Sequence, residues 1–254
     1  MATGRTLEKW TRFYVSGYDL SGFGRSVGPL LIEQDEADLT AWTDTVKGYL
    51  GNHVQCNLGV LNAIFDNTAT TGLHAVLGTV PNNRTVIVAK GIRAEPAAGD
   101  PAFCGEFLQS AYRLEDDGGA VVASIPFSGW PADATSLLYA GPWGQLLHAN
   151  GAETAANTGT GIDNYTGAFT TRGGYFVYQV FAGNGTATLS VDDSADNVAF
   201  LALSGATSGS VNCAVRSAGL VALGTGATVR QYLRWQLALG TATSVTFVTA
   251  FVRG

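Results

Sequence analysis

Charged residues are scarce in this chain. Asp, Glu, Lys and Arg make up only 13% of its 254 residues, about half the usual share, and lysine occurs only at Lys9, Lys47 and Lys90. A free monomer usually keeps a strongly charged surface for solubility. Two interpretations stay open: much of the surface is covered in an assembly, or a Thr-, Ser- and Gly-rich β-protein stays soluble without charge.

Basic runs are also missing, and the net charge is −6. A domain that binds duplex nucleic acid needs a footprint of lysine and arginine for the phosphates. The composition therefore argues against a duplex-binding domain. It is compatible with a surface that DNA slides past without sticking.

Cysteine pairs and long apolar runs are absent from the sequence. Cys56, Cys104 and Cys213 are far apart and form no C-x-x-C pair, so zinc and dithiol redox chemistry have no support. We interpret them as small buried hydrophobes in strands of a reduced, cytosolic product. No run is long enough to span a bilayer, and the segment Met1–Trp10 lacks the apolar core of a secretory signal.

The segment Gly24–Gly28 spells G-x-S-x-G, which raises the question of a serine hydrolase. A nucleophile elbow needs a strand running straight into the motif and a helix straight after it. Here breakers precede the motif, and Pro29 with an apolar run follows it. None of the three histidines lies in a strong motif. We therefore predict that Ser26 is a turn residue and that the chain is not an enzyme, with no catalytic residue and no cofactor.

Alternation of apolar and polar residues predicts a mainly β, antiparallel fold with one face of each sheet on a core. The clearest strands are expected at His53–Val60, Thr186–Val191, Val229–Leu237 and Ser244–Val252, with further strands at Thr85–Ala89, Ala120–Phe127 and Tyr175–Phe181.

One amphipathic helix is predicted at Asp35–Leu50, because Leu39, Trp42 and Val46 recur at helical spacing. Acidic residues at its start would interact favourably with the helix dipole, and Gly51 would suit the C-terminal cap. A second, short helical piece is predicted at Leu73–Leu77.

Composition changes near Trp130, which predicts two domains, residues 1–130 and 131–254. The second is poorer in charge and contains a long polar segment, Asn150–Gly167, expected to be a surface loop. Similar β-runs close both halves, which hints at a duplication. Trp130, Tyr139 and Trp143 either stack on sugars or pack the junction between the halves, and we favour the junction.

Carboxylates cluster at Asp192–Asn197, but a calcium loop would need more oxygen ligands at fixed steps and usually a late Glu. We interpret the cluster as a hairpin turn and expect no metal site. Asp116–Gly119 is likewise a hairpin-turn signal.

The chain resembles the major tail proteins, or tail tube proteins, of long-tailed bacteriophages. In the first half the resemblance is carried by Phe13–Gly22, Asp38–Thr40, Val46–Gly51, Val54–Val60, Leu73–Leu77, Thr85–Ala89, Pro96–Ala102 and Ser110–Tyr112, and in the second by Val191–Asn197 and Val229–Trp235. It implies a β-sandwich or partly open barrel of the tail-tube type with one helix, followed by a second β-sandwich-like domain. It also implies that Tyr18–Pro29 is a loop between two strands, in which Ser26 has no chemical role.

The resemblance also implies a structural virion protein, made in the host cytoplasm, whose rings stack into a tube that conducts DNA during ejection. Its expected partners are further copies of itself and other virion tail proteins. DNA would pass without specific binding, and no membrane is involved. A capsid decoration protein and a tail-associated carbohydrate- or receptor-binding module remain alternatives.

The segment Leu30–Asn52 is predicted to make contacts between subunits, with Glu33, Asp35, Glu36 and Trp42 as candidate contact residues. A ring of three chains is favoured over six, because a second half this poor in charge suits packing between neighbours better than a free position outside. Whether that half lines the tube as a second repeat or decorates it stays open.

Overall fold

The computed structural model describes residues 7–38, 40, 42, 45–47, 49–80, 82–92, 94–129 and 141–254. In the first half it contains a 3-10 turn, η1 (Glu8–Trp10), one α-helix, α1 (Leu73–Leu77), and the strands β1 (Thr11–Val15), β2 (Tyr18–Asp19), β3 (Gly24–Gly28), β4 (Leu31–Asp38), β5 (Tyr49–Asn57), β6 (Gly59–Ile64), β7 (Asn82–Lys90), β8 (Pro101–Gln109), β9 (Arg113–Asp117) and β10 (Ala120–Ser128).

The second half is built from strands in the part of it that is described. They are β11 (Trp143–Glu153), β12 (Asn157–Thr158), β13 (Ile162–Asp163), β14 (Phe169–Thr170), β15 (Gly174–Gly183), β16 (Thr186–Ser194), β17 (Leu201–Asn212), β18 (Ser217–Ala222), β19 (Val229–Arg230), β20 (Tyr232–Leu239) and β21 (Val245–Arg253). The mainly β, antiparallel, sandwich-like fold expected from the sequence is confirmed.

Most expected strands lie where alternation placed them, because alternate side chains meet a core. In β16, Ala187, Leu189 and Val191 are buried while the threonine and serine between them are half-buried. The segment His53–Val60 is not one strand. Its start belongs to β5, which pairs with β4, and its end belongs to β6, which pairs with β3 and β10.

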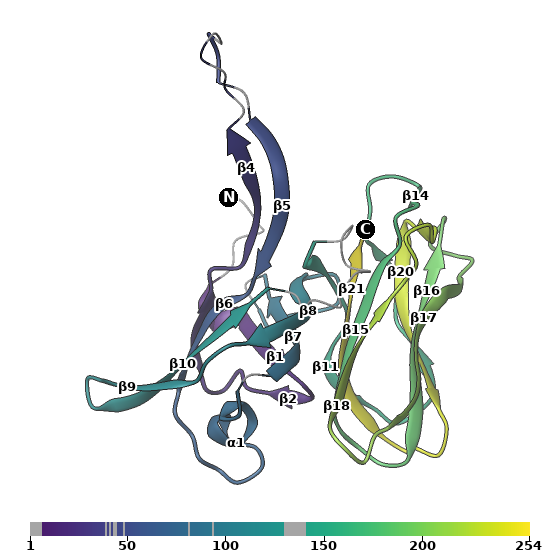
Figure 1. Ribbon diagram of the computed structural model, residues 1–254. Helices are drawn as coiled ribbons and strands as arrows, with labels where there is room; N and C mark the ends of the chain where they lie inside the picture. The colour runs from purple at the N-terminus through teal and green to yellow at the C-terminus, as the bar shows by residue number, and fades with distance from the viewer. Residues whose placement is uncertain are drawn as a thin grey trace.

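A twelve-stranded sheet runs through both halves, in the order β18-β15-β21-β11-β8-β10-β6-β3 (Figure 1). Strand β8 joins the halves: one edge pairs with β7, and the other pairs with β10 near Gln109 and with β11 near Pro101. Strands β1 and β2 extend the sheet beyond β7. No ladder between described residues joins β3 to β1 or β2, so the sheet of the first half stays open.

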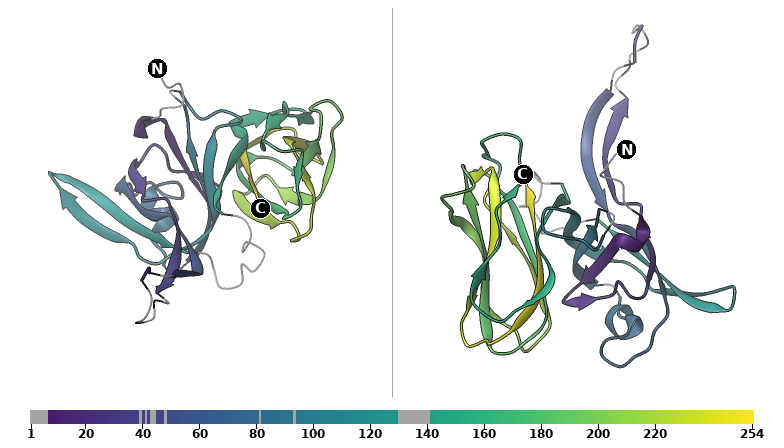
Figure 2. Two further views of the ribbon diagram at one scale, coloured as in Figure 1. Left: turned by 90° about the horizontal axis from the view of Figure 1, so that it is seen from above. Right: turned by 180° about the vertical axis from the view of Figure 1, so that it is seen from behind.

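The second half is a two-layer sandwich. A second sheet, β12-β20-β16-β17 with β13 also on β20, covers the β18-β15-β21-β11 end of the large sheet. Figure 2 shows the two halves side by side, and two hairpins, β4–β5 and β9–β10, leave the first half in different directions. The division of the chain at Trp130 stays a prediction, and residues 130–140 lie outside the described part.

Three apolar cores organise the molecule. One fills the first half around Phe13, Phe107 and Phe127, and one fills the sandwich around Phe247 and Trp235. The third lies between the halves and is made by Tyr14, Ile87, Ala89, Ala102 and Cys104 from the first with Leu146, Tyr175, Val177, Val248, Ala250 and Val252 from the second. Strands β15 and β21 are therefore apolar on both faces, since each face meets a different core.

Buried polar groups also join the halves. The Gln179 side chain on β15 accepts a hydrogen bond from the Gly17 backbone N–H at 3.0 Å and donates to the Tyr14 carbonyl at 3.0 Å. The Tyr175 hydroxyl lies 2.9 Å from the carbonyl oxygens of Cys104 and Gly141, and burial raises the pKa of this hydroxyl well above its usual value. Such satisfied groups fix how the halves meet, since a shifted arrangement would leave them unpaired.

All three cysteines are buried and free. Cys56 and Cys104 lie in strands as expected, but Cys213 lies in the turn that follows β17, so the expectation of a strand there is wrong. Burial raises the pKa of the Cys104 thiol, so this thiol is inert packing rather than a nucleophile. Within the described ranges, the structure contains no helix with the length and apolar character needed to traverse a lipid bilayer.

Candidate functional site

The largest departure from the sequence predictions is the β4–β5 arm, the hairpin formed by Leu31–Asp38 and Tyr49–Asn57. It projects well beyond the body of the first half (Figure 1). Its strands pair from Leu31↔Asn57 to Asp38↔Tyr49. The helix predicted at Asp35–Leu50 is therefore wrong.

The physical reason is that a short amphipathic helix is stabilised mainly by packing its apolar face on a core. Trp42 and Val46, which share the expected apolar face, are 105% and 78% exposed in this chain. Among the described residues no core covers them, and the β4–β5 ladder satisfies the backbone groups of the flanking strands instead. Leu39, the third residue of the expected face, lies outside the described residues.

All four predicted contact residues lie on this arm. Glu33 stands opposite Gln55 and Glu36 opposite Gly51, and both glutamates are exposed. Asp35 falls between them, where the register of the ladder shifts. Trp42 lies in the connection between the two strands. The arm thus presents carboxylates along one strand and apolar side chains near its far end.

A second projection is the β9–β10 hairpin, of which the sequence predicted the turn at Asp116–Gly119 and the strand at Ala120–Phe127 but not β9. The turn is confirmed: Gly118 and Gly119 have φ of 59° and 94°, which suit glycine. Every residue of β9 is exposed, including Leu114 at 47%. The alternation of Leu114 with charged neighbours was the signal that could have revealed this strand.

Ser26 lies in strand β3 and not in a loop, so the prediction of a continuous loop over Tyr18–Pro29 is wrong. Strand β3 pairs with β6, and the Asn62 side-chain amide donates to the Ser26 hydroxyl at 3.1 Å. The strand is followed by β4, not by a helix. This is edge-strand geometry, and it differs from the strand–turn–helix of a nucleophile elbow.

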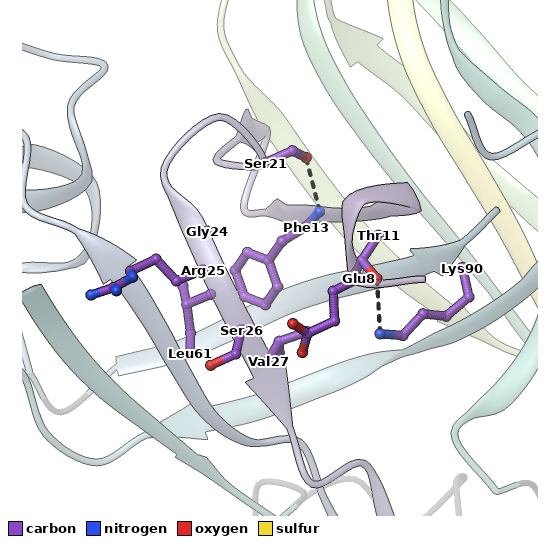
Figure 3. A pocket seen from close by; sticks show the side chains of 10 residues that line it. All are labelled: Glu8, Thr11, Phe13, Ser21, Gly24, Arg25, Ser26, Val27, Leu61 and Lys90. Carbon is purple, nitrogen blue, oxygen red and sulfur yellow. Dashed lines mark hydrogen bonds between the residues drawn. The ribbon is translucent and has the colours of Figure 1, made fainter. Parts of the chain in front are cut away.

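A small pocket adjoins Ser26, and Figure 3 shows its lining. It is formed by Glu8, Thr11, Phe13, Ser21, Gly24, Arg25, Ser26, Val27, Leu61 and Lys90. The Lys90 ammonium donates to the Thr11 hydroxyl at 2.9 Å, and partial burial lowers the pKa of Lys90. None of the lining residues is a histidine, so the lining supplies no histidine base for the serine.

The histidine with the most unusual surroundings is His148, which belongs to the second half. Its ring stacks on Phe247 at 4.1 Å between centroids and meets the edge of Trp235 at 4.6 Å. Its Nε2 lies 3.3 Å from a Glu153 carboxylate oxygen. Burial lowers the pKa of His148 more than this carboxylate raises it, so the neutral ring is favoured. Packing, not catalysis, accounts for this histidine.

The carboxylate cluster at Asp192–Asn197 is partly strand and partly turn. Asp192 and Asp193 belong to β16, are buried, and pair with Arg234 and Arg230. The turn itself is as expected: Asp196 accepts backbone hydrogen bonds from Val198 and Ala199, which lowers its pKa to about 2. No cluster of metal-ligating side chains occurs among the described residues.

Of the three aromatic residues expected near the junction, only Trp143 is described. Its ring meets Phe103 edge-on at 5.1 Å, and 42% of the residue is exposed. This contact joins β11 to β8, which supports the junction interpretation for Trp143. Trp130 and Tyr139 lie outside the described residues.

The fold and its surface define a mainly β protein with two projecting hairpins and exposed apolar side chains on them. Comparison of the sequence with protein-family models and with curated proteins gives no match. Among solved structures the chain is similar to the Dit protein of phage SPP1, described as a paradigm of the hub adsorption apparatus in phages that infect Gram-positive bacteria. That similarity covers 95% of this chain and 98% of the other, with 12% identity and a TM-score of 0.35. A likeness this slight carries no argument about function.

Proposed function

We propose that this chain is a structural protein of a phage tail that assembles with copies of itself into rings. The rings would stack into the tube through which DNA leaves the virion. The observation that carries the proposal is the β4–β5 arm, whose apolar side chains Trp42 and Val46 are left exposed by the described part of the chain. The resemblance of the sequence to tail tube proteins supplies the context.

The exposed side chains of the arm favour a protein partner. A tryptophan buries about 150–250 Å² when it packs. At about 25 cal/mol per Å², covering Trp42 alone would contribute about 4–6 kcal/mol before the costs of association. An aromatic residue held out on a paired hairpin is typical of an anchor that inserts into a neighbour.

The charge distribution supports a conduit for DNA. The first half carries fourteen acidic and nine basic residues, and the second carries six acidic and five basic residues. The acidic surplus of the first half includes Glu33, Glu36 and Asp38 on the arm. An acidic wall repels phosphates and lets a duplex slip past.

The number of chains in a ring depends on the role of the second half. If both halves supply strands to the inner wall, three chains close a ring, which is the arrangement we favour. If the second sandwich stands outside, six chains are needed. Rotational averaging of ring images by electron microscopy distinguishes the two arrangements.

The proposal is tested with the paired substitution Trp42→Ala/Val46→Ser. We expect the wild-type chain to form rings or tubes, seen by electron microscopy and by light scattering after size-exclusion chromatography. The variant should remain a folded monomer with an unchanged thermal midpoint, because both side chains are exposed. Charge reversal by Glu33→Lys or Glu36→Lys should also leave the monomer folded and impair assembly.

The matched control is Val215→Ser, since Val215 is 60% exposed in the second half, away from the arm. It should assemble as the wild type does. A wild-type chain that stays monomeric at high concentration would contradict the proposal. So would an arm variant that builds the same rings.

A further inference from the structure

A shallow groove lies at one end of the second sandwich, on the connection between β13 and β15. We call it the end groove. It is lined by Tyr165, Phe169, Thr170, Thr171, Arg172 and Gly254. Tyr165 is 38% exposed and Phe169 55% exposed, so both rings are accessible. Figure 1 shows this connection, labelled β14, at the end of the sandwich.

The backbone that carries these side chains is held by Arg253 of β21. Its Nε donates to the Asn164 side-chain carbonyl at 3.0 Å, and its Nη1 donates to the Thr170 hydroxyl at 3.2 Å. Its Nη2 donates to the Arg230 carbonyl at 2.6 Å. The guanidinium also lies 5.2 Å from the centroid of the Tyr165 ring. One half-buried arginine therefore fixes the near and far ends of the connection.

Further contacts hold the same segment from both sides. Asn164 donates to the Gln145 side chain at 2.7 Å, which ties the start of the connection to β11. Phe169 pairs with Arg230 in the β14–β19 ladder, which ties its end to β19. A binding loop held in this way loses little conformational entropy when a ligand binds.

The chemistry of the lining is mixed. Exposed aromatic rings offer apolar faces to the C–H surface of a sugar ring, and threonine hydroxyls can exchange hydrogen bonds with its hydroxyl groups. Arg172 is exposed and takes part in none of the ion pairs between described residues. Its planar fork of donors matches a carboxylate or a phosphate.

We propose that the end groove binds a saccharide that carries an anionic group, with Tyr165 and Phe169 as stacking residues and Arg172 as the contact for the charge. A purely apolar protein contact would not require the hydroxyl groups and a free guanidinium in the same groove. Since the whole chain has a net charge of −6, general attraction to anionic polymers is disfavoured, and recognition must come from local groups.

The test is affinity electrophoresis of the full chain in native gels that contain polygalacturonate, a phosphomannan or dextran. We expect retardation by polygalacturonate or phosphomannan, which tells whether a carboxylate or a phosphate is preferred, and none by neutral dextran. Tyr165→Ala/Phe169→Ala should raise the dissociation constant obtained from the retardation by about tenfold or more, because two ring contacts are lost. Arg172→Gln should weaken the retardation by the charged polymers.

Two matched controls accompany these variants. Val198→Ala/Leu201→Ala removes exposed apolar side chains, 82% and 59% exposed, outside the groove. Arg216→Gln removes an arginine that lies over Tyr18, away from the groove. Both should be retarded like the wild type.

Folding of each variant is checked by circular dichroism, and the single substitutions Phe169→Ser and Arg172→Gln serve if the paired variant fails to fold. The proposal is overturned if none of the polymers retards the wild type, or if the groove variants keep full retardation. It is equally overturned if Phe169→Ser changes only the oligomeric state, which would make the groove a contact between subunits. The same gels are run in the Trp42→Ala/Val46→Ser background, which is expected to stay monomeric, so that binding by the groove is separated from ring formation by the β4–β5 arm.

Discussion

Two pairs of antiparallel strands, one in each half, have the same kind of ladder and opposite surroundings. The β4–β5 arm leaves the body, with Trp42 fully exposed near its far end. The β16–β20 pair lies in the sandwich, where Trp235 is only 6% exposed. Strand pairing satisfies the backbone N–H and C=O groups of both pairs. Only the β16–β20 pair has a second sheet against which its side chains are buried. The arm therefore contributes little to the stability of one chain and leaves its apolar side chains for a partner.

The two halves also differ in how their exposed strand edges are protected from pairing with other chains. The projecting strands β4 and β9 carry carboxylates, which discourage uncontrolled edge-to-edge pairing. Strand β17, at the edge of the second sheet, has no charged residue over Leu201–Asn212. Instead, its register shifts against β16 where Gly205 and Gly209 adopt positive φ. Such bulges twist an edge and protect it without charge, which explains how the second half tolerates so few charged residues.

The largest difference in the free energy of unfolding is expected between the alanine variants of the two tryptophans. Trp235→Ala should lower the free energy of unfolding by about 3–5 kcal/mol, because it leaves a cavity in the sandwich core. Trp42→Ala should leave the free energy of unfolding of the monomer unchanged, since the residue has no cover to lose. Urea denaturation of both variants, at a concentration where the chain is monomeric, measures the difference. Similar losses of unfolding free energy in the two variants would contradict the inference that Trp42 does not stabilise the monomer.

An intermediate effect is expected from ion pairs. Arg234 donates to Asp192 through Nε at 3.0 Å and through Nη2 at 2.9 Å, and the Asp192 side chain is 4% exposed. Asp192→Ala should cost about 2 kcal/mol, since Arg234 would lose its partner while keeping partial access to water.

The exposed counterpart is the Arg25–Asp117 pair, 2.5 Å apart, with the Asp117 side chain 61% exposed. Asp117→Ala should cost less than about 1 kcal/mol, because water screens both charges. Thermal denaturation at low and high salt compares the two variants. A larger loss for Asp117→Ala would show that the projecting hairpin is held more firmly than its exposure indicates.

The smallest effect is expected from pH. Burial lowers the pKa of folded His148 below the ordinary value of 6.5, so the unfolded chain binds the proton more readily. The stability that depends on the neutral ring is present above about pH 6.5 and is lost as the pH falls through the folded pKa. Urea midpoints between pH 8 and pH 5 should fall on the acid side.

This fall should be smaller in His148→Gln than in the wild type, while His74→Gln serves as the control in the first half. Asp196, whose folded pKa is about 2, affects stability only in more acid solution. An unchanged pH dependence in His148→Gln would mean that the ring gains water or a closer carboxylate when it is protonated.

The candidate sites, like the fold, were predictable from the sequence only in part. The sequence predicted that Glu33, Asp35, Glu36 and Trp42 belong to one contact segment, Leu30–Asn52, and all four lie on the arm. It assigned that element the wrong secondary structure, and their contact role stays a prediction. The sequence predicted a surface loop over Asn150–Gly167, where the structure has the end of β11, β12 and β13, and it did not single out Tyr165. Phe169 and Arg172 lie beyond that segment, and only the fold brings Arg253 against Tyr165 and Thr170.

The amino-acid sequence by itself determined the strands that have one face on a core, such as β16, together with α1 and the Gly118–Gly119 turn. In these segments the local pattern and the final environment agree, because a period of two matches a half-buried strand. The absence of a nucleophile elbow at Ser26 could also be read from the breakers around it.

Only the tertiary structure decided the β4–β5 arm, the strand at Ser26 and the junction between the halves. Helical spacing of Trp42 and Val46 predicts a helix only if a core is present to receive them, and the described part of the chain leaves both exposed. Strand β3 exists because β6 offers it an edge. Strands β15 and β21 became the centre of the molecule because two cores, formed by residues distant in the chain, meet on their opposite faces. Such pairings depend on long-range contacts, which local patterns do not contain.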